Sequence, residues 1–571
     1  MSTDYVKYHI LDDRLCLSDS IKYGVYQSGQ NCTVNTFEAL SKSTSTLTFN
    51  IQVPSEQTVI DRRVLLRNKF KIRITGTPAV GQYLVNLGST DALAPFPVHQ
   101  MISTAQITVN NNTVNLNVQD VINVLLRSND IRELAAYNSM CPTYLDAYLN
   151  YGDATLANNN PLGGFANTSD PDLVPRGAFQ VLEVTGNTVG DGASLKTVDI
   201  TYQTTEPVLV SPFIFADPKS NNQGILGVQN MNFVFNFASN ANRAFRSGSA
   251  TAFTTCVLQE VVESALIFNF ITPKSSQLLP ARNVCPYYSL PRYITTISGV
   301  SGLTAATTSN GVLTPTSGKI QSNSLQLSQI PDKLIIFVRK QIGSQSAKDS
   351  DSFLPIRSVS INFNNLSGIL SSATKQNLYQ YSRESGYNGD WNQWSGVAYN
   401  PSPAGGDGVS VPTSGSMLML EFGRHINLPE TWFAPGSIGN FNLQFSVDVE
   451  NYSSNNYSSS AGLELVVVTM NSGLFIVERG TTSVMEAILT RQDVLDAANQ
   501  EPYSNQSVIR MVGGGFFDKL KTVAQNLLPK ALPVAKAILG QVDNPMAKRG
   551  AELIGSLGYG RSGGRLQSRV A

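Results

Sequence analysis

One order of short segments occurs twice in this chain of 571 residues, and it constrains the fold more than any single motif. In the first copy, 107–111 ends in an Asn pair and leads, through a short apolar return, into a helix-like stretch at 118–127. In the second copy, 361–365 leads in the same way into 372–383. Each copy predicts a strand, a tight turn, a returning strand and a helix.

A second pair of segments follows in the same order. The strand-like stretch 230–237 precedes 265–268 by about the distance that separates 440–445 from 473–476. The chain is therefore predicted to contain two domains with one element order. The alternative is that any two β-domains share such patterns.

The body of the chain has the alternation of β-strands. Apolar and polar residues alternate at 47–53 and 441–447, which is typical of strands with one buried face. Turn residues at 471–473 separate two apolar runs, 465–470 and 474–477, which predicts a hairpin. Long stretches rich in Gly, Ser, Asn and Pro connect the strands and are expected to be loops, at 152–176, 299–318 and 385–415. An all-β protein with few helices is the expected class.

Proline residues indicate where the first domain ends. Pro273, Pro280 and Pro286 interrupt the strand pattern between 272 and 290. Two sandwiches of about 230 residues each are within the size range of single all-β domains. The expected parts are an N-terminal arm at 1–40, a first sandwich at 41–280, a second at 281–480, a helix and linker at 481–514, and a tail at 515–571.

Charge is scarce in the chain and unevenly distributed. Only 14% of residues are charged, against roughly 25% in ordinary soluble domains, so faces covered by neighbouring molecules, or a secreted β-protein, are expected. Residues 515–571 contain nine Lys or Arg and three Asp or Glu, a net charge of +6, which leaves the rest at −6. Such a tail is expected to have its own partner, an acidic membrane surface or nucleic acid.

Cysteine and histidine are too scattered to predict a metal centre or a catalytic triad. Five Cys and three His are spread over the chain without ligand spacing. We expect buried free thiols in a reducing compartment, since no apolar core of signal-peptide length follows Met1. No catalytic residue, metal or cofactor is predicted.

Several segments of the second half resemble a known family. They are 360–370, the Leu-Tyr-x-x-Ser stretch 378–382, and the Trp-bearing stretches 388–391 and 394–396. They are similar to the strand, Asn/Gly turn, helix and Trp loop of the hexon-like double jelly-roll major capsid proteins. That adenovirus-like lineage includes virophages, polinton-like viruses and adintoviruses, and the resemblance covers about residues 40–480.

The resemblance implies an all-β fold of two tandem eight-stranded jelly-roll sandwiches with a few short helices, followed by an amphipathic helical C-terminal tail. It implies a structural protein of the virion, assembled in host cytoplasm or nucleus, and no enzyme activity or small-molecule substrate. Homotrimers would form pseudo-hexagonal capsomers of an icosahedral shell. The expected partners are the chain itself, neighbouring trimers, and penton or minor capsid proteins.

A cleavage site is predicted where the composition changes. The stretch 481–498 is expected to be a helix capped by Ser483, with Glu486 three residues on. The sequence Met511, Val512, Gly513, Gly514, Gly515 then matches the recognition pattern of adenovirus-type cysteine proteases, with cleavage after Gly514. Glycine triplets are also common in linkers, so a simple linker is the alternative.

After the glycines, apolar residues fall on one helical face of a basic segment: Phe516, Phe517, Leu520, Val523, Leu527 and Leu528. Such a helix can lie in a membrane interface. Packing inside the shell against neighbouring subunits is the alternative. The final Gly- and Ser-rich stretch contains Arg561, Arg565 and Arg569, which could contact genome phosphates without reading sequence, although three arginines are few.

Two other functions remain open from the sequence. A carbohydrate-binding β-sandwich could use Trp391, Trp394 and Trp432 to stack on sugars. Its candidate carboxylate pairs would be Glu384 with Asp390, or Glu421 with Glu430. A penton-type or minor capsid protein is the other alternative, for which one jelly roll would normally suffice.

Overall fold

A computed structural model describes most of the chain between residues 31 and 498. The described residues are 31–87, 91–129, 141, 145–150, 180–213, 224–248, 253–273, 279–400, 408–459, 462–478 and 480–498. Gln27–Asn499 forms one compact unit. Residues 1–30 and 499–571 lie outside the described residues.

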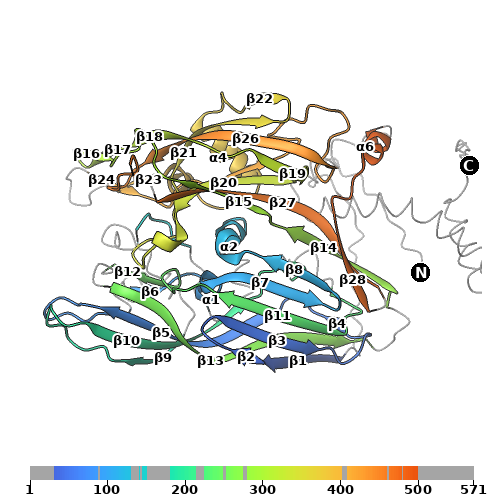
Figure 1. Ribbon diagram of the computed structural model, residues 1–571, viewed down its shortest axis with the longest axis horizontal. Coiled ribbons are helices and arrows are strands. Elements are labelled where there is room, and N and C mark those ends of the chain that lie inside the picture. The colour runs from blue at the N-terminus through green and yellow to red at the C-terminus, as the bar shows by residue number, and fades with distance from the viewer. Residues whose placement is uncertain are drawn as a thin grey trace, which may run out of the picture. The chain divides into compact units, whose positions relative to one another are not determined.

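The first half of the described chain folds into two antiparallel sheets and a small ribbon (Figure 1). One sheet has the order β1 (Asn31–Glu38), β13 (Phe253–Thr272), β5 (Leu65–Gly76), β10 (Lys196–Pro207), β9 (Gln180–Thr185), with β4 (Val59–Ile60) beside β13. The other has the order β2 (Ser41–Lys42), β3 (Thr46–Gln52), β11 (Asn230–Phe237), β7 (Ile102–Val109), β8 (Asn112–Leu116). The ribbon pairs β6 (Asp91–Leu93) with β12 (Phe245–Ser247), and the helices are α1 (Pro97–Met101) and α2 (Val118–Arg127).

The second half repeats this arrangement. Its first sheet has the order β14 (Arg282–Ser289), β27 (Leu463–Glu478), β20 (Lys333–Lys340), β25 (Leu418–Glu421), with β15 (Arg292–Ile297) and β28 (Thr481–Glu486) also on β27. Its second has the order β18 (Thr316–Gln321), β26 (Ile438–Asn451), β21 (Ile356–Phe363), β22 (Leu366–Ile369), with β19 (Leu325–Gln329) on β26. Two hairpins are added, β16 (Thr307–Ser309) with β17 (Val312–Thr314) and β23 (Val397–Asn400) with β24 (Val409–Pro412). The helices are α4 (Lys375–Glu384), α5 (Trp391–Ser395) and α6 (Arg491–Ala498).

The central strands of the two halves correspond to one another. In the first sheets β13, β5 and β10 correspond to β27, β20 and β25, and in the second sheets β11, β7 and β8 correspond to β26, β21 and β22. Helix α2 follows β8 as α4 follows β22. Figure 1 shows the first sandwich below the second, with α2 between them. The predicted all-β fold of two tandem jelly rolls is therefore confirmed.

The cores follow from the alternation of the strands. In β3, Leu47, Phe49 and Ile51 are fully buried while Asn50 and Gln52 face solvent. Across the first sandwich, Phe233 of β11 packs edge-on against Phe268 of β13 at 5.9 Å. Strands β20 and β27 differ, because nearly every residue is buried on both faces. One sheet of the second jelly roll is thus covered from both sides.

The two Asn pairs make the same turn. Asn110 and Asn364 begin the two-residue loops between β7 and β8 and between β21 and β22, with φ of 51° and 50°. Asn tolerates this left-handed conformation better than most residues with a side chain. The Oδ1 of Asn364 accepts the N–H of Asn442 at 2.9 Å, and the Oδ1 of Asn110 accepts the N–H of Gln229 at 2.8 Å.

Two predicted elements were wrong. The predicted hairpin at 465–477 is one continuous strand, β27, because turn residues Asn471 to Gly473 continue the ladder against β14. The predicted helix at 481–498 is split, because 481–486 pairs with β27 as strand β28. Helix α6 starts later, and Thr490 rather than Ser483 caps it, exchanging hydrogen bonds with Asp493.

Two other expectations were partly wrong. The expected loops at 299–318 and 385–415 contain the added hairpins and α5, while 152–176 lies outside the described residues. Cys141, Cys256 and Cys285 are buried as predicted, but Cys32 is exposed because it lies in the edge strand β1. Burial raises the pKa of the Cys256 thiol to about 12. No helix in the described part of the chain is long and apolar enough to cross a membrane.

Candidate functional site at the junction of the two jelly rolls

Helix α2 brings charged side chains into the junction between the jelly rolls. Nine of its ten residues are buried, including Asp120 in the first turn and Arg127 in the last. These positions suit the helix dipole, since a carboxylate is favoured at the N-terminus and a guanidinium at the C-terminus. The apolar residues of the helix pack onto its own jelly roll, mainly against β7 and α1. The two charges are therefore available to the other jelly roll.

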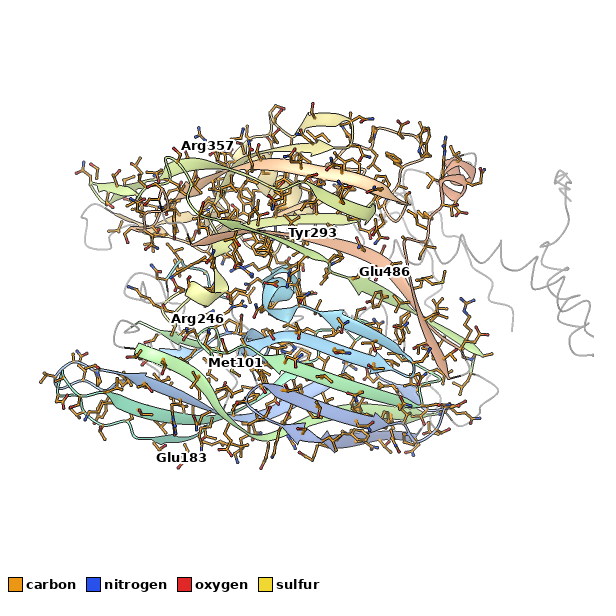
Figure 2. The ribbon with its side chains drawn as sticks, viewed as in Figure 1. Met101, Glu183, Arg246, Tyr293, Arg357 and Glu486 are labelled. Atoms are coloured by element: carbon orange, nitrogen blue, oxygen red, sulfur yellow. The ribbon has the colours of Figure 1, made fainter. Side chains whose placement is uncertain are left out.

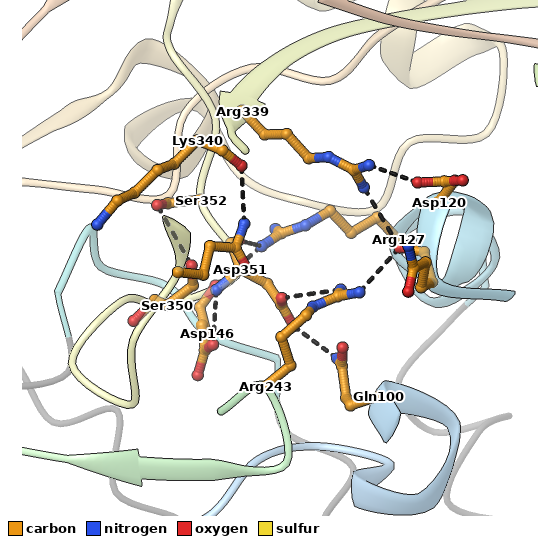
Figure 3. Close-up of polar contacts among 12 residues, drawn as sticks. Gln100, Asp120, Arg127, Asp146, Arg243, Arg339, Lys340, Ser350, Asp351 and Ser352 are labelled. Carbon is orange, nitrogen blue, oxygen red and sulfur yellow. Dashed lines mark hydrogen bonds and ion pairs between the residues drawn. The ribbon is translucent and has the colours of Figure 1, made fainter. Parts of the chain in front are cut away.

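Asp120 binds two arginines of the second jelly roll. Arg339, at the end of β20, donates through Nη2 to Asp120 (Figure 3). Its Nε donates to Glu464 of β27 at 3.0 Å. Arg292 of β15 pairs with the other oxygen of Asp120. Arg339 is 3% exposed, so its charge is compensated almost entirely by these two carboxylates. This fixes α2 against the sheet that is buried on both faces.

Asp351 is the centre of a second group of contacts. Arg243 and Arg246, which flank the start of β12, contact its two oxygens at 3.4 and 3.3 Å. The amide of Gln100 donates to the same carboxylate at 2.6 Å (Figure 3). Burial opposes ionisation of the Asp351 carboxyl, but Arg246, Arg243 and Arg127 outweigh it and hold its pKa below the usual value.

The segment around Asp146 completes the junction. Its carboxylate accepts from Nε of Arg246 and from the backbone N–H of Asp351, at 3.0 and 2.9 Å. Arg127 donates to the carbonyls of Asp146 and Asp351 at 3.0 and 2.9 Å. The carbonyl of Arg127 in turn accepts the N–H of Asn388, just after α4. Figure 2 shows Arg246 between the two jelly rolls.

The junction is suited to holding two domains in one orientation. Four ion pairs cross it, from Asp120 to Arg339 and Arg292, and from Asp351 to Arg243 and Arg246. Removing one partner of a buried pair leaves an uncompensated charge, which typically costs about 3–5 kcal/mol. Directional hydrogen bonds also fix the relative orientation more sharply than apolar contact does.

The aromatic residues considered for sugar binding pack within the second jelly roll. Trp394 is fully buried and its indole N–H donates to the carbonyl of Met417 at 3.3 Å. The ring of Trp391 stacks on that of Trp394, with 6.2 Å between the ring centroids. Trp432 is covered by the guanidinium of Arg491 at 4.1 Å. Trp394 is therefore inaccessible, and one face of Trp391 and of Trp432 is occupied by a protein group.

The candidate carboxylates have structural partners as well. Asp390 caps α5 by accepting the N–H of Gln393 at 2.7 Å. Glu384 and Glu421 both pair with Arg424, which brings these two together but in neither of the pairings considered. In the ranges that the structure describes, no group of three His, Cys, Asp or Glu could hold a metal ion.

The remaining predicted residues lie outside the described residues. They are the cleavage stretch 511–515, the apolar face within 516–528, and the three arginines from 561 to 569. The junction was not predicted. The signal available was charge in apolar surroundings, since Arg339 directly follows the run Leu334 to Val338.

Comparison with known proteins assigns both halves of the chain. Residues 3–274 match the family described as Sputnik virophage major capsid protein 1st domain. Residues 290–473 match the family described as major capsid protein V20 C-terminal domain. The chain belongs to the double jelly-roll major capsid proteins. It is a structural component of a viral capsid, as the sequence resemblance implied.

Individual relatives of this capsid protein agree over nearly its whole length. Capsid protein V20 of Sputnik virophage is 28% identical over 581 residues, which covers 97% of this chain and 93% of the relative. A chain of the Sputnik virophage cryo-EM structure superposes with a TM-score of 0.74 at 27% identity, covering 88% of this chain and 98% of that one. The mavirus major capsid protein shares the fold, with a TM-score of 0.67 at 15% identity, covering 88% and 99%.

Proposed function

We propose that this capsid protein forms homotrimers that tile an icosahedral virion as pseudo-hexagonal capsomers. The observation that carries the proposal is the junction, which fixes two jelly rolls of equal strand order in one chain. Three such chains around a threefold axis supply six similar units, which is the geometry of a hexagonal tile. In this proposal the role is structural, with no catalysis and no cofactor.

The test is the native mass and particle morphology of the purified full-length chain. Light scattering should give three times the chain mass, and electron microscopy should show hexagonal capsomers or shells built from them. A stable monomer at every salt concentration and pH would contradict the proposal. Neighbouring trimers and penton or minor capsid proteins are the further partners in the virion, with assembly in host cytoplasm or nucleus.

We also propose that a viral cysteine protease releases the tail between Gly514 and Gly515. The support is the sequence pattern and its position between the folded body, described to residue 498, and a tail of net charge +6. Mass spectrometry of mature virions should find a body ending at Gly514. The variant Gly513→Val should keep the tail attached, whereas Gly515→Ala, which follows the scissile bond, should be cleaved. Full-length chain in mature virions would contradict the release.

The tail is also proposed to act on membranes, with packing inside the shell as the alternative. Its apolar helical face and its lysines fit an interface between acyl chains and anionic head groups. Full-length protein should release dye from anionic vesicles, and Leu520→Asp with Leu527→Asp should abolish the leakage. Thr522→Asp, on the polar face, is the matched control. Equal leakage by the wild type, the double variant and the control would favour packing of the tail inside the shell.

A further inference from the structure

Exposed apolar side chains gather at one edge of the first jelly roll. The structure has fourteen exposed large hydrophobic residues in its described part, and seven of them belong to the segments 77–87 and 180–196, here called the edge lobe. They are Val80, Tyr83, Val181, Leu182, Val184, Val189 and Leu195. Figure 2 places Glu183 of this lobe at the outer edge of the first jelly roll, away from the second.

The edge lobe is held in place by its own hydrogen bonds. Gly190 donates to Gln82 and accepts from Gly81, at 2.7 and 3.0 Å. Asn187 exchanges hydrogen bonds with the backbone of Val85. A side chain at Gly190 would collide with the carbonyls of residues 78 and 79 at 2.6 Å, so the two loops approach as closely as glycine allows. The apolar surface is therefore preformed rather than a chance conformation of a loop.

Burying the edge lobe would remove little charge from water. Residues 77–87 contain no charged side chain, and 180–196 contain Glu183, Asp191 and Lys196. The Asp191 carboxylate already accepts from Ser194 and from the N–H of Ala193, which lower its pKa well below the usual range. In addition, among the strands that the structure describes, β9 is the last of its sheet and pairs with β10 alone. An apolar, nearly uncharged surface beside an open strand edge is typical of a covered interface.

A second such surface lies on the other jelly roll. The hairpins β16–β17 and β23–β24, here called the hairpin tip, are joined by a hydrogen bond from Ser410 to Gly311 at 2.8 Å. Val312, Tyr399 and Val409 are exposed on them, and their strands contain no charged residue. The hairpin tip and the edge lobe both lie on the left in Figure 1. Both remain exposed in a single chain, so neither covers the other within it.

We propose that the edge lobe of one copy of the chain packs against the hairpin tip of a second copy in the same capsomer. This rests on the trimer proposed above and assigns the contact that builds it. Because the two surfaces differ and belong to different jelly rolls, each copy uses both in a head-to-tail contact. Under the threefold symmetry proposed above, this contact closes into a ring of three copies. Ten of the fourteen exposed large hydrophobics would then be at this contact.

The test is a charge exchange between the two surfaces, measured as native mass by light scattering of the full-length chain. Val80→Lys with Leu195→Lys in the edge lobe, and Val312→Glu with Val409→Glu in the hairpin tip, should each convert trimers to monomers. Far-UV circular dichroism should match the wild type, because all four side chains are exposed and each chain should keep its fold. A chain with all four substitutions should regain the trimer, since lysines of one copy then face glutamates of the next.

Val34→Lys with Leu40→Lys is the matched control, because these residues are equally exposed but lie outside both surfaces. It should remain trimeric. Trimers that survive the edge-lobe or hairpin-tip substitutions, or a four-substitution chain that stays monomeric, would overturn the assigned contact while the trimer itself stands. A wild-type chain that is monomeric under all conditions would instead remove the proposed trimer.

Discussion

Helices α2 and α4 occupy equivalent places in the two jelly rolls but have opposite environments. Nine of the ten residues of α2 are buried, against Leu378 and Ser382 alone in α4. The charges of α2 bind the neighbouring jelly roll, whereas Glu384 of α4 pairs with the half-exposed Arg424. The same element thus serves as a joint in one copy and as a surface helix in the other. Equal folds therefore do not imply equal energetic roles.

The largest difference is expected when each helix loses one carboxylate. Asp120→Asn leaves Arg339 and Arg292 short of a counter-charge in the buried junction, which should lower the free energy of unfolding by about 3–5 kcal/mol. Glu384→Gln removes a solvent-screened pair and should cost about 0–1 kcal/mol. Urea unfolding of both variants measures the difference. Equal losses would mean that the junction is no more stabilising than the surface.

The pH dependence should also separate the junction from the outer face. The pKa of Asp351 is below its unfolded value, so the ionised form favours folding above about pH 4, and this stability is lost as pH falls through the folded pKa. The destabilisation by Asp351→Asn should therefore shrink progressively below about pH 4. Urea midpoints of the wild type and the variant, compared from pH 7 down to pH 2.5, measure the narrowing.

Asp448, on the outer sheet of the second jelly roll, is a control because its pKa shift has the opposite sign to that of Asp351. Burial raises the pKa of the Asp448 carboxyl in the folded state, so its ionised form disfavours folding. The contribution of Asp448 to the free energy of unfolding therefore becomes more favourable as pH falls through its folded-state pKa. Asp448→Asn should be neutral or stabilising at pH 7. An Asp351→Asn difference that stays constant down to pH 2.5 would show that the junction does not depend on the ionised carboxylate.

The two Asn turns should respond equally, because they are the part of the repeat that both copies use alike. Asn110→Ala and Asn364→Ala each place alanine in the left-handed region and remove the hydrogen bond that the Asn side chain accepts from the neighbouring strand. Each should cost about 1–2 kcal/mol in urea unfolding. The corresponding glycine variants keep the conformation and should cost less. Effects that differ severalfold between the copies would show that the turns are not equivalent.

The elements that occur in both jelly rolls were predicted from the sequence, whereas the contacts that differ between the two jelly rolls were not. Alternation and the Asn pairs identified β7, β8, α2, β21, β22 and α4, because these elements are determined by local pattern. The Leu-Tyr-x-x-Ser stretch even contains Leu378 and Ser382, the two buried residues of α4. These signals depend on neighbours within a few residues, so they are visible in the chain alone.

The failures arose where distant segments decide the structure. Asn471 to Gly473 continue β27 because β14, nearly 200 residues earlier, provides a strand for them to pair with. The junction unites Asp120 with Arg339 and Arg243 with Asp351, more than 100 residues apart in each case. No local pattern distinguishes these charges from solvent-exposed ones. Arg339 is exceptional, because it ends an apolar strand.

The smallest expected difference concerns how the two helices begin. Thr374 and Asn377 form a reciprocal capping box at the start of α4, whereas Asn117, before α2, makes no side-chain capping bond. Thr374→Ala should therefore cost about 1 kcal/mol, and Asn117→Ala only a few tenths. Hydrogen exchange at the first-turn amides measures both, with Thr374→Ser as a control that retains the cap. A larger loss at Asn117 would mean that α2 depends on its own terminus rather than on burial in the junction.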